Sequence, residues 1–193
     1  MNDLDVFLAH AIQESAMLTY QSAMNEVRSQ YPVIGQHEFH LRPGEGPGHA
    51  EVFFPTESYN PAPGLNTIEI RNRDVQGKEL QSLIAGETLH WIGAIDPRTK
   101  EPVDKTFRSF KGQLRESLTK DQLEVDRKEY LRARREDKEH RSFDDWMDQS
   151  RTDAYIRGWL FPDKENDWVR SGAYTSEQAA LLERMRQYLQ IAK

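Results

Sequence analysis

The sequence predicts an α+β protein: an N-terminal helix, a small three-stranded sheet and a central helix, followed by a mostly helical C-terminal half. Apolar residues recur at helical spacing through 3–30, 78–92 and most of 105–192. Short alternating runs, typical of strands, stand at 36–41 and 67–71, and an apolar run at 50–54. Composition agrees, because 30% of the residues are charged and only 37% are apolar, as expected of helices with long solvated faces.

The 193 residues suffice for one domain, 1–193, with an α/β part at 1–93 and a helical part at 94–193. Cysteine is absent, which excludes disulfides, Cys-ligated zinc and a thiol nucleophile. The chain has no apolar run of about 18 residues and no visible signal peptide, so we predict no membrane span and no secretion. The predicted compartment is the cytoplasm or a particle assembled there.

The net charge of −6 is unevenly distributed. Residues 1–97 hold 5 basic and 13 acidic side chains, whereas residues 98–141 hold 14 basic and 10 acidic ones. An acidic front half argues against a broad nucleic-acid surface, and the mixed charges of the middle are typical of a solvated helix. We therefore do not predict nucleic acid as a partner.

The first half predicts a helix at Asp3–Gln30, which ends before Pro32 because the residue preceding proline is pushed out of the helical region. The strands at 36–41 and 50–54 flank a Gly/Pro-rich segment, and we expect them to form a β-hairpin. The third strand is Thr67–Arg71, and a proline-rich loop, 55–66, leads to it.

The central helix is predicted at Lys78–Ile92, with Gly93 as its stop. Further helices are expected at 105–118, 119–139, 146–161 and 175–192, and the residues between 162 and 172 form a loop. Capping-box patterns open the second and third of these helices. The charged helix at 119–141 and the loop at 55–66 are the candidate partner surfaces.

The central helix carries an incomplete metal motif. Zinc metallopeptidases use His-Glu-x-x-His, which places two histidines one turn apart on one helix face and makes the glutamate a general base. Here Glu87 and His90 are in register, but Gly86 stands where the first histidine would be.

Two resemblances follow from these residues. The order of helix, strands and Glu-x-x-His helix over residues 1–93 resembles the zincin metallopeptidases. The chain is also similar to a family of uncharacterised tailed-phage and prophage proteins. The similar segments are Gly46-Pro-Gly-His-Ala-Glu-Val-Phe-Phe-Pro55, Asn60-Pro-Ala-Pro-Gly64, Thr67-Ile-Glu-Ile70, Gly86-Glu-Thr-Leu-His90, Phe143-Asp-Asp-Trp146 and Ser150-Arg-Thr-Asp-Ala-Tyr-Ile-Arg-Gly158. This second resemblance implies a viral origin, and hence the host cytoplasm or the virion, but no established activity.

If zinc binds, the residues have definable roles. His90 would be a ligand and Asp153 a further one, while Glu87 would activate the water and Arg157 would stabilise the oxyanion. A carboxylate-bridged pair of metals would instead need the segment Asp137-x-x-His140 as its second half. A purely structural reading is also open, in which Glu87 bonds His90 and Asp153 pairs with Arg157 along their helices.

Losing one histidine from a three-ligand site removes most of its zinc affinity. The sequence therefore predicts a degenerate, non-catalytic zincin-like protein with no cofactor. The alternative is a zinc metallopeptidase with Glu87 as its base and His90 as a metal ligand. The expected partner is a phage or host protein, in a homo-oligomer or a virion assembly.

Overall fold

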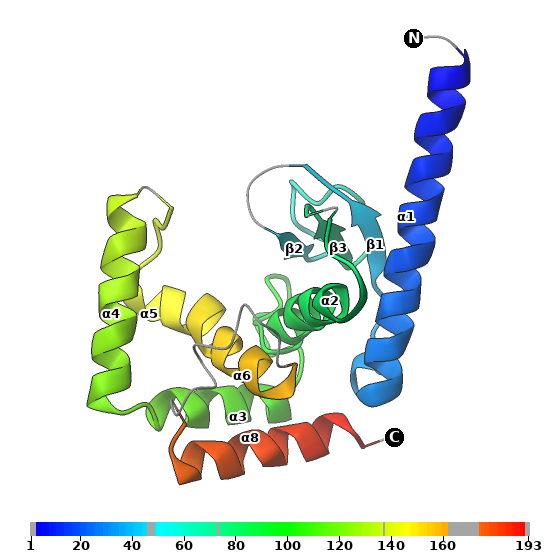
Figure 1. Cartoon of the computed structure of the whole chain (residues 1–193). Helices are drawn as coiled ribbons and strands as arrows, with labels where there is room; N and C mark the ends of the chain where they lie inside the picture. The colour runs from blue at the N-terminus through cyan, green and yellow to red at the C-terminus, as the bar shows by residue number, and fades with distance from the viewer. Residues whose placement is uncertain (1–2, 46–48, 73, 137, 162–173, 192–193) are drawn as a thin grey trace.

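The computed structural model of the chain describes residues 3–45, 49–72, 74–136, 138–161 and 174–191 (Figure 1). Helix α1 runs along one side of the molecule and helix α4 stands at the opposite side. A three-stranded sheet and helix α2 lie next to α1, and the remaining helices complete the molecule beside and below α2. The predicted α+β class, with an N-terminal helix and a helical C-terminal half, is confirmed.

Helix α1 spans Asp3–Gln30, the bounds that the sequence predicts. Its C-terminal half is buried through Tyr20, Met24 and Val27, which pack into the core. Its N-terminal half stands clear of the sheet (Figure 1). Large apolar side chains in that half are exposed. The apolar stripe seen in the sequence therefore packs into the core only in the C-terminal half of the helix.

The sheet contains β1 (His40–Pro43), β2 (Ala50–Phe53) and β3 (Thr67–Ile70) in the order β1-β3-β2. Strand β3 is parallel to β1 and antiparallel to β2. The predicted hairpin of the first two strands is therefore wrong, since β3 lies between them. All four residues of β3 are buried, which explains why this strand takes the centre of the sheet.

The first strand also begins later than predicted. Residues Ile34–Gln36 form a 3₁₀ turn, η1, and the strand starts at His40 rather than at 36. The rings of His37 and Phe39 instead pack edge-on against Trp91 of α2, with centroid separations of 4.8 and 5.2 Å. These two residues therefore pack against α2 instead of alternating between the two faces of a sheet.

Helix α2 (Gly77–Ile92) is the centre of the core. It contacts α1, β2 and helix α6, so three sides of it are covered. Gly93 follows as its C-cap and its N–H donates to the carbonyl of Leu89, as expected for the end of the helix. The buried side chains of α2 are Leu80, Ser82, Leu83, Ile84, Ala85, Thr88, Leu89, Trp91 and Ile92.

The helical half comprises α3 (Lys105–Glu116), α4 (Lys120–Arg135), α5 (Phe143–Trp146), α6 (Thr152–Leu160) and α8 (Ser176–Leu189). The predicted capping boxes are present in whole or in part. Thr119 and Gln122 exchange side-chain and backbone bonds, and Ser142 accepts from the Asp145 N–H. The loop predicted at 162–172 lies outside the described residues.

The helix predicted at 146–161 is divided by a π-turn, η2 (Met147–Arg151). The Thr152 N–H donates to the Met147 carbonyl, five residues back, and the Thr152 hydroxyl donates to the same oxygen at 2.7 Å. A π-turn of this kind holds one residue more than an α-helical turn.

Within the described ranges, no helix is both long enough and apolar enough to cross a membrane.

Candidate functional site

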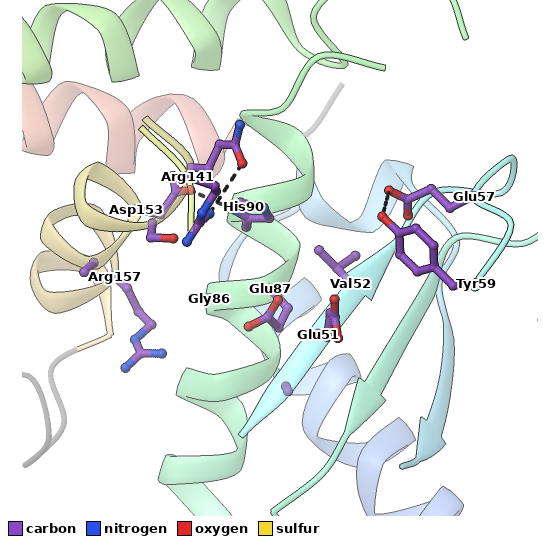
Figure 2. Close-up of a pocket in the computed structure, with 14 residues that line it drawn as sticks. Glu51, Val52, Glu57, Tyr59, Gly86, Glu87, His90, Arg141, Asp153 and Arg157 are labelled. Atoms are coloured by element: carbon purple, nitrogen blue, oxygen red, sulfur yellow. Dashed lines mark hydrogen bonds and ion pairs between the residues drawn. The ribbon is translucent and has the colours of Figure 1, made fainter. Parts of the chain in front are cut away.

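One face of α2 and one face of α6 meet beside strand β2. Helix α2 presents Gly86, Glu87 and His90, which its periodicity places on neighbouring turns, and α6 presents Asp153 and Arg157 one turn apart (Figure 2). The side chains project towards a pocket of about 580 Å³, within the range of ligand sites. The lining residues are Ala50, Glu51, Val52, Glu57, Tyr59, Gly86, Glu87, His90, Arg141, Gln149, Ser150, Asp153, Ala154 and Arg157.

An ion cluster forms the floor of this pocket. His90 Nδ1 lies 2.8 Å from Asp153 Oδ2, a hydrogen bond that joins α2 to α6. Lys111 of α3 reaches the same carboxylate, with its Nζ 2.8 Å from Oδ2 and 2.7 Å from Oδ1. The Lys111 side chain is only 2% exposed, so its charge is neutralised within the protein rather than by water.

The charges of the cluster shift its proton equilibria. Burial alone would raise the pKa of Asp153, but Lys111 and His90 outweigh it and lower that pKa. Burial alone would lower the pKa of His90, but its hydrogen bond to Asp153 and the charge of that carboxylate raise it. Burial raises the pKa of Glu87, and the positive charges of His90 and Arg157 offset this only in part.

The side chain of Arg157 occupies the space next to Gly86. A β-carbon at position 86 would lie 2.7 Å from Cδ of Arg157, closer than two carbon atoms can approach without movement. A histidine at position 86 would therefore compete with Arg157 for the same space. The Arg157 side chain thus fills the space that a side chain at position 86 would need.

These residues do not fit a three-ligand zinc site. The Nδ1 atom of His90 is bonded to Asp153, both oxygens of that carboxylate contact Lys111, and the place of the first ligand is next to Arg157. In the part of the chain that the structure describes, no three His, Asp or Glu side chains are grouped so that they could hold a metal ion. That no zinc is bound stays a prediction, which elemental analysis tests directly.

All four site residues that the sequence singles out line this one pocket: Glu87, His90, Asp153 and Arg157. Their hydrogen bonds, however, differ from those that the structural interpretation of the sequence suggests. The hydrogen bond at His90 joins it to Asp153 across two helices rather than to Glu87 within α2. The proposed second half of a two-metal site cannot be assessed as a unit, because Asp137 lies outside the described residues, while His140 is exposed.

The sequence analysis missed Lys111 and Arg141. Lys111 interrupts the apolar stripe of the helix predicted at 105–118, which is formed by Phe107, Leu114 and Leu118, and a charged residue in such a stripe signals a buried ion pair. Arg141 lies beyond the end of α4 and is positioned by Glu139, which accepts hydrogen bonds from its guanidinium. No periodicity predicts that contact.

A second, smaller pocket of about 280 Å³ continues from the first. The two pockets share four lining residues: Val52, Glu57, His90 and Gln149. Phe54, Ile95 and Pro97 are larger apolar residues that line only the second pocket. Together the two form a groove along β2 with His90 at its middle, and we call it the β2 groove.

No protein-family model, curated protein or solved structure matches this chain. The function of the protein is therefore inferred from the geometry of the site.

Proposed function

We propose that this protein is a non-catalytic, zincin-like binding protein whose β2 groove receives an extended segment of a partner protein. The observation that carries the proposal is the contact between Arg157 and Gly86. An arginine beside the helix at this point supplies a fixed positive charge where a peptidase would need a metal ligand. The resemblance to phage proteins makes another phage protein or a host protein the expected source of the segment.

The position of β2 at the end of the sheet supports an extended ligand. The Arg71 N–H donates to the His49 carbonyl, and Ala50 is opposite Ile70. In an antiparallel pair this alternation directs the N–H and C=O groups of Ala50 and Val52 away from β3. Both residues line the first pocket, so a peptide could pair with them as an added strand.

The side chains around the groove suggest what such a segment would contain. Glu51, Glu57 and Glu87 stand on the side of the sheet and α2, while Arg141 and Arg157 stand across the pocket (Figure 2). A segment with charges of both signs would match the first pocket. An apolar residue next to them would match the second pocket.

A displayed random-peptide library tests this proposal directly. We expect selection on the wild-type protein to enrich peptides that bind in solution, and expect Val52→Pro to lose that binding because proline has no N–H to donate. Val52→Thr is the matched control, because it keeps the N–H and the β-branched shape. Enrichment of no peptide, or equal binding by Val52→Pro, would overturn the proposal.

Elemental analysis distinguishes the peptidase alternative. We expect no stoichiometric zinc in the purified protein before or after a chelator wash, and no difference in His90→Ala. Near-stoichiometric zinc that is lost in His90→Ala would instead support a metallopeptidase, and the Glu87→Gln variant would then be expected to fold without activity.

A further inference from the structure

Helix α1 has two apolar faces, and the core uses only one. Tyr20, Met24 and Val27 are buried against the sheet and α2. On the other face Phe7, Ile12 and Leu18 are 69%, 69% and 73% exposed, and Leu8 is also exposed. These four large side chains lie within about three turns of one helix, which is unusual for a surface that faces only water.

The exposed face belongs to the half of α1 that projects from the molecule (Figure 1). A helix of 28 residues is about 42 Å long, and tertiary packing normally supplies most of the stability of such a helix. The outward half receives little of that packing: Ala16 packs against the core, whereas Ile12 borders a pocket at the end of β1 and stays exposed. We call the residues Phe7, Leu8, Ala11, Ile12, Ser15 and Leu18 the outer stripe.

We propose that two copies of this chain pair through their outer stripes as an antiparallel helix pair. Leu8, Ala11, Ser15 and Leu18 follow the alternating three- and four-residue spacing of a coiled-coil seam. Small residues stand at its middle and leucines at its ends. An antiparallel pair centred near Gln13 sets Leu8 of one copy against Leu18 of the other, and Ala11 against Ser15.

The area involved is sufficient for association. Covering Phe7, Leu8, Ile12 and Leu18 in both copies removes on the order of 1,000 Å² from solvent, which is about the lower limit for a specific interface. A two-fold pair uses the same surface twice, so each copy supplies the apolar complement that the other needs. The seam residues are uncharged, which suits self-pairing.

The charges of the helix decide the orientation. The first 27 residues contain Asp3, Asp5, Glu14 and Glu26 but no Lys or Arg. A parallel pair would set each acidic residue beside its own copy and bring the two positive helix N-termini together. The antiparallel pair places the two Glu26 positions about 39 Å apart along the axis and separates the two helix N-termini, so that of these four residues only Glu14, at about 3 Å along the axis, stays close to its own copy.

Sedimentation velocity at micromolar concentrations tests the association. We expect the wild type to sediment as a dimer and Leu18→Glu as a monomer, because a carboxylate in the seam would be buried without a partner. The matched control is Leu131→Glu, which alters another exposed leucine, on α4, and should remain dimeric. Far-UV circular dichroism checks that both variants fold. A monomeric wild type, or a dimeric Leu18→Glu, would overturn the proposal.

Disulfide trapping tests the orientation, because the chain contains no cysteine of its own. In the antiparallel pair positions 8 and 18 of different copies meet, whereas position 8 is about 15 Å along the axis from its own copy. We expect an equimolar mixture of Leu8→Cys and Leu18→Cys to form mixed disulfides on oxidation, and neither variant alone to do so. Self-disulfides of each variant would show a parallel pair, and no disulfides at all would exclude this seam.

Discussion

Two buried aspartates link neighbouring helices through ion pairs, but the two aspartates lie in different surroundings. Asp126 of α4 accepts from the Arg151 guanidinium and the Tyr155 hydroxyl, and all three side chains are buried. Asp153 of α6 accepts from Lys111 and His90, and His90 reaches the β2 groove with 34% of its side chain exposed. The first cluster is enclosed within the protein, whereas the second has one member, His90, that lines the β2 groove.

The two clusters differ in how far the surrounding side chains enclose them. Arg151 also lies over the rings of Trp146 and Tyr155, so the Asp126 cluster is enclosed by aromatic side chains. The Asp153 cluster ends at an imidazole with a second nitrogen available to the groove. Mutations should therefore affect stability most at Asp126 and should affect binding most around His90.

The largest effect is expected for Asp126→Ala. This change removes the carboxylate that pairs with the buried Arg151 guanidinium, and breaking a buried ion pair typically costs 3–5 kcal/mol of unfolding free energy. Urea unfolding followed by circular dichroism measures that loss. Glu124→Ala is the control, because its pair with Lys128 is exposed and should contribute less than about 0.5 kcal/mol. A loss below about 1 kcal/mol in Asp126→Ala would remove the distinction between the clusters.

A smaller loss is expected for Lys111→Met. Asp153 keeps its bond to His90, so the cost should be about 2 kcal/mol, which is within the range for hydrogen bonds to charged groups. The double variant Lys111→Met with Asp153→Leu should recover part of this loss, because removing both partners leaves no unpaired charge. A double-mutant cycle in urea measures the coupling energy, and additive losses would indicate that the two residues do not interact.

The free energy of unfolding should depend on pH through both His90 and Asp153. The raised pKa of His90 contributes stability that is present below about pH 6.5 and is lost as the pH rises through the folded-state pKa. The lowered pKa of Asp153 contributes stability that is present above about pH 3.8 and is lost as the pH falls through its folded-state value.

Urea unfolding across this pH range measures the loss of stability at high pH and the loss at low pH, and NMR titration of the His90 ring measures its pKa. His90→Gln should remove most of the loss at high pH and leave most of the loss at low pH. An imidazole that titrates below 6.5 would contradict the proposed pairing with Asp153.

The smallest effect is expected at Gly86. Alanine in a helix interior gains roughly 0.5–1 kcal/mol over glycine, but at this position its β-carbon must displace Arg157. We expect Gly86→Ala to change stability by less than about 0.5 kcal/mol and to weaken peptide binding. In an Arg157→Ala background the same change should stabilise the protein by the full amount. Equal effects in both backgrounds, measured by urea unfolding, would show that the contact is unimportant.

The parts of the fold that depend on local periodicity could be predicted from the sequence. The bounds of α1 and α2 follow from apolar spacing and from their stop signals at Pro32 and Gly93. The strand order could not be predicted, because it depends on how deeply β3 is buried, which is a property of the whole core. The hairpin was the simplest local solution, and long-range packing replaced it.

The same division applies to the candidate site. The motif at Glu87 and His90 and the helix of Asp153 and Arg157 could be found by inspection, and the structure brings them to one pocket. Their actual bonding could not be found, because Lys111 enters from α3, a third helix, and reaches Asp153 only once the helices have packed. A charged residue within an apolar stripe was the one available signal.

The π-turn at Met147–Arg151 sets the direction in which α6 faces the site. A π-turn holds one residue more than an α-helical turn, and each added residue rotates the following helix by about 100°. Without that residue, Asp153 and Arg157 would face another direction and Lys111 would lose its counter-ion. Deleting one residue from 147–151 should therefore keep the helices but separate Asp153 from His90 and Lys111.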